Sequence, residues 1–148
     1  GKRPRGWLGS GLQETWNTLD HLAAEDVNYV ADWSNDDQPY LINTDHGPLV
    51  SIPYTQEVND IGMFTRRNFT ADEVFGMLKD EFDELYRASE KGGRIMNVGL
   101  HPHIIGRAYR ARALREFLDY AKGFEGVWWA KREEIAEWYL DNHESHIS

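Results

Sequence analysis

The chain has 148 residues, a formal net charge of −9 and no cysteine. This length suits one domain with its own core, and the acidic charge argues against a nucleic acid or an anionic membrane as partner. The absence of cysteine excludes a disulfide framework, a thiolate metal site and a cysteine nucleophile. No apolar run is long enough to cross a membrane and no signal peptide is visible, so we expect a cytoplasmic protein.

The N-terminal part of the sequence predicts a helix and then a strand. Residues 10–24 place apolar side chains at helical spacing, and Ser10 with Gln13 could form a capping box at the start of this helix. Residues 27–33 form a short apolar run, which predicts a strand.

A loop, a second strand and a longer loop follow. Residues 34–40 are polar and predict a loop, whereas residues 49–54 predict a strand that ends at Pro53. Residues 55–69 predict a long irregular loop. Loops of this length inside compact domains are often functional.

The clearest helical pattern covers residues 70–88. Thr70 and Glu73 have the spacing of a capping box, and apolar side chains recur on one face of the helix behind them. Four further elements complete the chain: a strand at 95–100, a helix at 108–121, a short strand at 127–129 and a helix at 131–142.

Strands that alternate with helices imply a mostly parallel sheet or a barrel. The strands predicted for this chain are too few to close a barrel. The sequence therefore predicts an α/β fold, either a small open domain or part of a barrel.

Two histidines follow the strand expected at residues 95–100, where an active site of an α/β domain would lie. If the backbone stays extended, the side chains of His101 and His103 point to the same side, and two imidazoles there could bind a metal. Two other interpretations stay open. One histidine could be buried and the other exposed, or one could act as an acid or base while the other shapes the pocket.

Other polar residues also allow more than one interpretation. Asp32 is either an ordinary acid at a strand end or the carboxylate that orients a histidine. Arg3 could hold a carboxylate or belong to a solvated basic end. Glu57, Asn59 and Asp60 could bind a polar substrate or satisfy the loop backbone.

Together these pieces resemble the polysaccharide deacetylase superfamily, which is also called the NodB-homology or carbohydrate esterase family 4 group. The nearer likeness is to its allantoinase-like subgroup of metal-independent amide hydrolases. The resemblance covers nearly the whole chain and rests on segments 3–7, 32–33, 36–40, 51–54, 57–60, 99–101, 105–107, 117–121 and 127–130.

The resemblance implies that residues 1–148 form the C-terminal half of a catalytic domain, a distorted (β/α) barrel with mostly parallel strands. Arg3 matches the third motif of the family, whose arginine contacts the catalytic aspartate. Asp32 matches the fourth motif, whose aspartate orients the catalytic histidine. His101 matches the fifth motif, whose histidine protonates the leaving nitrogen. The residues expected to bind substrate are Trp33, Tyr54, Glu57, Asn59, Leu100 and His103, with Leu100 lining the acyl pocket.

The first two motifs of the family, an Asp-Asp pair and a His-x-x-x-His metal pair, have no match in this chain. The chain also opens on Gly1 and resembles the middle of a domain rather than its start. We therefore expect the missing half to come from a preceding segment or a partner polypeptide. Any divalent metal, such as zinc, would be bound mainly by that half, and metal dependence stays open. A homo-oligomer is also expected.

The function implied by the resemblance is hydrolysis of a non-peptide C–N bond in a small cyclic amide or ureide. The first alternative is deacetylation of an N-acetyl sugar. The second alternative is a non-catalytic structural subunit of a split hydrolase. Metal analysis and the mass of the native complex would discriminate an enzyme from a structural subunit.

Overall fold

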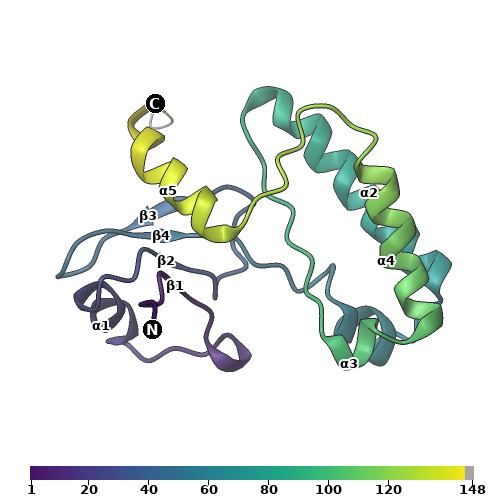
Figure 1. Cartoon of the computed structure of the whole chain (residues 1–148), viewed down its shortest axis with the longest axis horizontal. Coiled ribbons are helices and arrows are strands. Elements are labelled where there is room, and N and C mark those ends of the chain that lie inside the picture. Colours follow the sequence, from purple (N-terminus) through teal and green to yellow (C-terminus); the bar gives the residue numbers. More distant parts are fainter. Residues whose placement is uncertain (146–148) are drawn as a thin grey trace. The chain divides into compact units, whose positions relative to one another are not determined.

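A computed structural model describes residues 1–145, and the chain forms two compact units (Figure 1). The first unit contains residues 1–54 together with the chain from Trp129 onward, and the second contains residues 55–128. Each unit has its own apolar core. None of the helices in the described part of the chain is long and apolar enough to span a bilayer.

The first unit is built on a four-stranded sheet with the strand order β1-β2-β4-β3. The strands are β1 (Gly6–Trp7), β2 (Tyr29–Val30), β3 (Tyr40–Ile42) and β4 (Leu49–Ser51). Strand β2 pairs in parallel with both β1 and β4, whereas β3 runs antiparallel to β4. Parallel pairing therefore dominates, as the alternating elements predict.

Helices α1 (Thr18–Ala24) and α5 (Arg132–Asn142) pack against side chains from alternate positions of the strands (Figure 1). Val30 and Leu49 pack in one cluster, beside Leu22 of α1. Their sequence neighbours Ala31 and Val50 pack in another cluster with residues of α5. Successive side chains of a strand point to opposite faces, so the two helices lie on opposite faces of the sheet.

The helix predicted at residues 10–24 is wrong in its first part. A 3₁₀ turn covers Ser10–Leu12, and α1 begins only at Thr18. Gly11 and Leu12 have φ angles of 68° and 58°, which a right-handed helix cannot contain. The chain is therefore turned before α1, and Trp16 is fully exposed instead of lying on the apolar face.

Other strand predictions need correction too. The predicted strands at 27–33 and 49–54 exist but are shorter, and β1 and β3 were not predicted. Strand β1 depends on β2, a partner far away in sequence, which local patterns do not reveal. Strand β3 is short and pairs with the next strand, β4. Within the described residues, 127–129 form no strand.

The second unit is mainly helical. It contains a π-helix (Ile61–Arg66), where the sequence predicted irregular loop, and the helices α2 (Ala71–Ala88), α3 (Pro102–Ile105) and α4 (Ala108–Ala121). A 3₁₀ turn at Ser89–Lys91 follows α2, and another at His143–Ser145 follows α5 in the first unit. The helices predicted at 70–88, 108–121 and 131–142 are confirmed to within one residue at each end.

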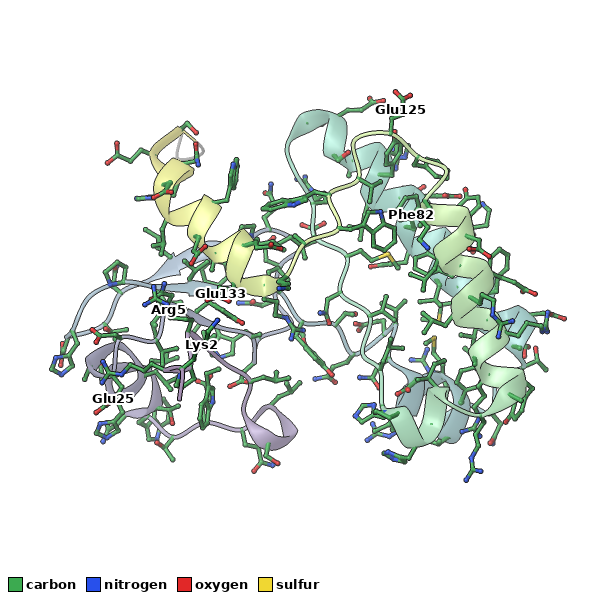
Figure 2. All side chains as sticks on the ribbon, in the orientation of Figure 1. Lys2, Arg5, Glu25, Phe82, Glu125 and Glu133 are labelled. Atoms are coloured by element: carbon green, nitrogen blue, oxygen red, sulfur yellow. The ribbon has the colours of Figure 1, made fainter. Side chains whose placement is uncertain are left out.

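Helices α2 and α4 lie side by side and run in the same direction (Figure 1). Asp72 near the start of α2 pairs with Arg112, and Asp83 further along accepts a hydrogen bond from Tyr120. The Phe82 ring, labelled in Figure 2, makes an edge contact with Phe117 at a centroid distance of 6.1 Å. This aromatic packing, rather than the exposed ion pairs, is the main source of stability at the interface.

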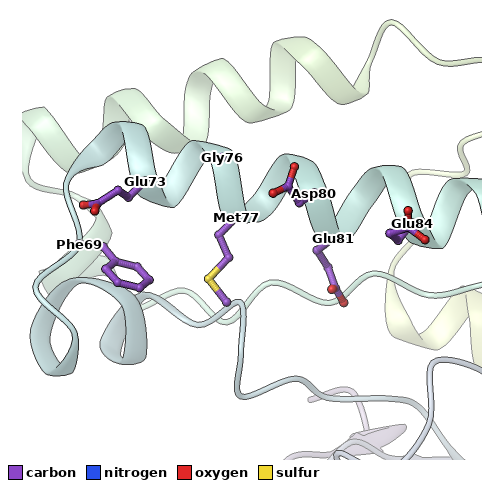
Figure 3. Close-up of a pocket in the computed structure, with 7 residues that line it drawn as sticks. All are labelled: Phe69, Glu73, Gly76, Met77, Asp80, Glu81 and Glu84. Carbon is purple, nitrogen blue, oxygen red and sulfur yellow. The ribbon is translucent and has the colours of Figure 1, made fainter.

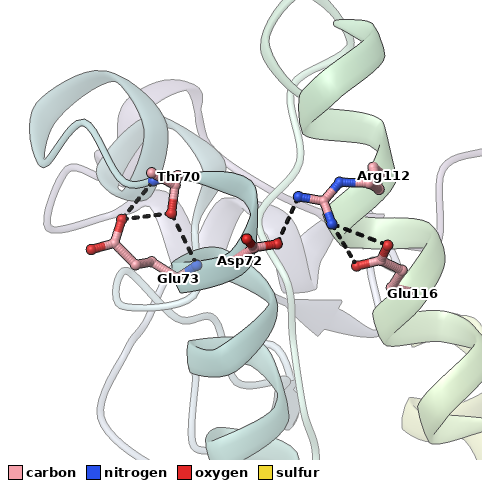
Figure 4. A network of polar contacts seen from close by, with 5 residues as sticks. All are labelled: Thr70, Asp72, Glu73, Arg112 and Glu116. Atoms are coloured by element: carbon pink, nitrogen blue, oxygen red, sulfur yellow. Dashed lines mark hydrogen bonds and ion pairs between the residues drawn. The ribbon is translucent and has the colours of Figure 1, made fainter.

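The start of α2 is fixed by the predicted capping box (Figure 4). The Glu73 backbone N–H donates to the Thr70 hydroxyl, and the Thr70 backbone N–H donates to the Glu73 carboxylate at 2.7 Å. The bonds that the Glu73 carboxylate accepts from the backbone N–H and the hydroxyl of Thr70 hold the pKa of Glu73 below its usual value. Beside the cap, Arg112 contacts the carboxylates of Asp72 and Glu116.

The strand predicted at residues 95–100 is not formed. In the described chain this segment pairs at one position only, where Gly99 forms a parallel bridge with Asn59. Met96 and Val98 pack against the core of the second unit, which explains the apolar pattern. A strand also needs a neighbouring strand with which its backbone forms a series of hydrogen bonds, and an apolar pattern does not show whether such a neighbour exists.

We expect Thr70→Ala to lower the free energy of unfolding by about 1 kcal/mol, because it removes the oxygen that satisfies a backbone N–H of the first turn. Urea denaturation followed by circular dichroism would measure the loss. Ser10→Ala is the matched control, because Ser10 is exposed and caps no helix. An equal loss in both variants would contradict the assignment of the cap.

Candidate functional site

In the second unit, two segments far apart in sequence are joined by a parallel bridge. The Gly99 N–H donates to the Val58 carbonyl at 3.0 Å, and the Asp60 N–H donates to the Gly99 carbonyl at 2.9 Å. Gly99 is buried, as are Val58 and Asp60. The bridge therefore places the side chain of residue 60 beside the residues that follow Gly99.

This arrangement brings together Asp60 and His101. The Asp60 carboxylate is completely buried, and its two oxygens accept from the same residue. Oδ2 accepts from the His101 backbone N–H at 2.7 Å, and Oδ1 lies 2.6 Å from His101 Nδ1. The imidazole side chain is 34% exposed. A carboxylate only accepts hydrogen bonds, so it fixes the ring proton on Nδ1 and leaves Nε2 for a substrate.

His101 also forms the N-cap of α3. Its backbone is extended, as expected for a residue before proline, and its carbonyl accepts from the N–H groups of Ile104 and Ile105. Gly106 closes the other end of α3, where a Cβ atom would lie 2.4 Å from the Pro102 carbonyl oxygen. The His101 backbone is therefore held at its carbonyl by α3 and at its N–H by Asp60.

The structure does not support a metal site at the two histidines. His103 lies on α3, so the extended backbone on which the pairing argument depends is absent. The two rings are 5.9 Å apart at 77°, and Nδ1 of His101 already contacts Asp60. Within residues 1–145, no group of three histidine, aspartate or glutamate side chains could hold a metal ion.

Asp32 lies in the first unit, directly after the buried residue Ala31 that follows β2. Its carboxylate is 5% exposed, and Oδ1 accepts from the Gly9 N–H at 2.6 Å. Oδ2 is buried without a hydrogen-bond partner, and so is Oε1 of the neighbouring Glu14. Burial raises the pKa of Glu14, and the adjacent Asp32 carboxyl raises it further. The role of Asp32 in orienting His101 stays a prediction.

Arg3 contacts two acidic residues that the prediction did not assign to it. Its guanidinium pairs with Asp26 at 2.6 Å and with Glu25 at 3.1 Å, and all these side chains are largely exposed. Exposed pairs of this kind contribute little to stability. The contact with a catalytic aspartate, which the resemblance implies for Arg3, also stays a prediction.

The residues expected to bind substrate are divided between the two units. In the first unit, Trp33 lies partly buried with its ring 6.3 Å from Tyr40, and Arg132 lies 6.0 Å from the Tyr54 ring. In the second unit, the exposed Glu57 accepts from the Thr55 hydroxyl, Asn59 accepts from the Ile61 N–H, and Leu100 and His103 are exposed.

A shallow hollow of about 610 Å³ lies along α2, and none of the predicted site residues lines it (Figure 3). Its walls contain two apolar side chains and several carboxylates. The lining residues are Phe69, Glu73, Gly76, Met77, Asp80, Glu81 and Glu84.

Sequence reasoning missed the pairing of Asp60 with His101 and the proximity of Glu14 to Asp32. Asp60 was predicted either to bind a polar substrate or to satisfy the loop backbone, and in the structure it accepts from both the backbone and the ring of His101. The bridge between residues 59 and 99 has no local signal, so the partner of His101 was hidden. Glu14 was placed in the first part of the helix predicted at residues 10–24, which is not helical around Glu14 in the structure.

Comparison with known proteins identifies relatives, although no family model matches the chain. A protein of Schizosaccharomyces pombe named "Putative polysaccharide deacetylase" is 34% identical over 125 residues, which are 76% of this chain and 39% of the relative. The crystal structure of Puue allantoinase is 36% identical with a TM-score of 0.86, and it matches 96% of this chain and 48% of its own. A "probable Polysaccharide deacetylase" from Pseudomonas aeruginosa PAO1 is 34% identical, with the same TM-score and the same coverage.

These matches confirm the predicted resemblance to the polysaccharide deacetylase superfamily, and the chain resembles the C-terminal half of its members. The mixed α/β fold with a sheet dominated by parallel pairs agrees with the deacetylase structures. The chain spans 39% of the curated relative and about half of the solved chains. The identity to the allantoinase is similar to that to the deacetylases, so similarity does not separate the two activities.

We expect the neutral His101 ring to carry its proton on Nδ1, and Asp60→Asn to move it to Nε2, because the amide would present a donor to Nδ1. The variant should also lose about 2 kcal/mol of stability, the scale of a hydrogen bond to a charged group. Long-range ¹H–¹⁵N NMR of the histidine rings reports the tautomer. Glu57→Gln, at an exposed position, should change neither property. A ring protonated on Nε2 in the wild type would contradict the pairing.

Proposed function

We propose that this chain, which resembles the C-terminal half of polysaccharide deacetylases, supplies the proton donor for hydrolysis of a non-peptide C–N bond. The substrate would be a small cyclic amide or ureide. The observation that supports this proposal most strongly is the buried Asp60 carboxylate against Nδ1 of His101, with the ring partly exposed. A carboxylate-oriented imidazole is a common general acid or base.

In this reaction the role of His101 follows from the leaving group. Water adds to the carbonyl carbon, and the C–N bond then breaks with its electron pair going to nitrogen. An amide or ureide nitrogen leaves poorly as an anion, so it must take a proton as the bond breaks. Nε2 of protonated His101 would donate this proton, and the Asp60 carboxylate would stabilise the positive charge before the transfer.

The group that removes a proton from the attacking water is assigned to the N-terminal half of the domain, on the same polypeptide or on another. Exposed apolar residues at the edge of the sheet support the need for that half. Strand β1 is one of the two edge strands, and Trp7 in this strand and Leu8 directly after it are 43% and 48% exposed. The N-terminal half would supply most of any divalent metal site, and this proposal assigns no step to such a metal.

This proposal also includes catalytic roles for Asp32 and Arg3, and substrate contacts by Trp33, Tyr54 and the other predicted residues. These assignments rest on the resemblance.

Deacetylation of an N-acetyl sugar is the second candidate. It breaks the same kind of bond and needs the same proton donor. The identity of 34% to the deacetylases of both S. pombe and P. aeruginosa supports it.

In the full-length protein, His101→Ala should lower kcat by about 10²–10⁴-fold, the usual contribution of a general acid. Allantoin and N-acetylglucosamine oligomers should be assayed side by side, since the preferred substrate discriminates between the two candidates. His103→Ala is the matched control, because its exposed ring does not contact Asp60 in the structure, and it should have a smaller effect. Full activity of the His101 variant would contradict the role of proton donor.

The 148-residue chain alone should be inactive, and activity should appear when it is joined to or mixed with the N-terminal half of the domain. Native mass spectrometry should then detect both halves in one complex. A single 17.2 kDa chain that hydrolyses substrate by itself would contradict this division of the site.

A further inference from the structure

Two carboxyl groups, those of Glu14 and Asp32, lie next to each other in the first unit. Asp32 follows β2 and is 5% exposed, while Glu14 is partly buried on the segment between the 3₁₀ turn and α1. Each has one buried oxygen without a hydrogen-bond partner, Oδ2 of Asp32 and Oε1 of Glu14. Two ionised carboxylates cannot satisfy each other, because both only accept hydrogen bonds.

The backbone holds this pair together. Gly11 and Leu12, with φ angles of 68° and 58°, turn the chain just before Glu14. Gly9 approaches Asp32 so closely that a Cβ atom would lie 2.9 Å from Oδ2 and 2.9 Å from the Gln13 carbonyl oxygen. The pair is therefore a fixed feature of the fold rather than an encounter of mobile surface side chains.

The surroundings indicate which of the two carboxyls holds a proton. Oδ1 of Asp32 accepts from the Gly9 N–H at 2.6 Å, so this oxygen already has a donor, whereas Oδ2 has none. Burial and the adjacent Asp32 carboxyl raise the pKa of Glu14, and the Trp33 indole N–H acts against them. Asp32 and Trp33 are the side chains that face the Glu14 carboxyl in this account.

We propose that Glu14 holds a proton at neutral pH and donates it to Oδ2 of Asp32, so that the pair shares one proton and one negative charge. This single proton satisfies both unpartnered oxygens. Glu14 is thereby a positioning residue: it fixes the orientation of the Asp32 carboxylate and stays next to Trp33. The catalytic consequence rests on the proposed function, whereas the shared proton does not.

The proposal has a defined pH dependence. A carboxyl whose pKa is raised on folding contributes stability that is complete below its unfolded pKa, near 4.5, and that is lost as pH rises through the folded pKa. Glu14→Gln should remove this loss, because a glutamine amide donates the same hydrogen bond and does not titrate. Glu14→Ala should lower the melting temperature, because it leaves Oδ2 of Asp32 unpartnered.

The deciding experiment is ¹³C NMR titration of the carboxyl carbons in the wild-type chain, with Glu14 assigned through bonds so that no variant needs to fold. We expect the Glu14 carbon to titrate well above the ordinary glutamate value of 4.5. A Glu14 carboxyl group that is already ionised at neutral pH would overturn the proposal. Glu57→Gln is the matched control and should leave the Glu14 curve unchanged.

Activity of the full-length protein gives a separate readout. Glu14→Gln should keep the wild-type kcat and pH profile near neutrality, whereas Glu14→Ala should lower kcat through misplacement of Asp32. Equal losses in both variants would overturn the positioning role. A late-titrating Glu14 carbon in a protein that hydrolyses none of the tested substrates would support the shared proton and contradict the proposed function.

Discussion

The interaction on which the second unit depends is the contact of one buried carboxylate with one residue. Asp60 has no exposed surface, and a charge in such a place is stable only when its oxygens are hydrogen-bonded. His101 supplies both partners, from its backbone and from its ring. The same contact satisfies a buried charge, fixes the ring tautomer and holds the residue at which α3 begins. The contact that stabilises this part of the fold is therefore also the one on which the proposed chemistry of His101 depends.

The buried aspartate of the first unit, Asp32, has fewer hydrogen-bond donors than Asp60. Asp60 has a donor for each oxygen, whereas Asp32 has the Gly9 N–H for one oxygen and a second carboxyl beside the other. A protein can keep an acid in such a place if a proton is shared, because the pair then has one charge. The two aspartates show that the number of hydrogen-bond donors around a buried carboxyl group, rather than the residue type, determines which contacts it makes.

Local patterns predicted the elements that local physics determines. The helix after Thr70 was predicted from a capping box and an apolar face, and both are present in the structure. The helix predicted at residues 10–24 from apolar spacing and a Ser10–Gln13 capping box is wrong in its first part, because Gly11 and Leu12 adopt positive φ angles. The strand at 95–100 failed for another reason. Its apolar side chains are packed, but in the described chain its backbone meets a partner only at Gly99.

The sequence by itself determined the α/β character, the histidine at residue 101 as the candidate acid, and the resemblance to polysaccharide deacetylases. These follow from periodicity, from capping residues and from motifs that are contiguous along the chain. Only the tertiary structure decided which carboxylate contacts His101 and which side chain faces Asp32. Asp60 and His101 are separated by 41 positions, and Glu14 follows a turn with positive φ angles at Gly11 and Leu12. Such pairings depend on backbone hydrogen bonds between distant segments, and no local pattern of residues encodes them.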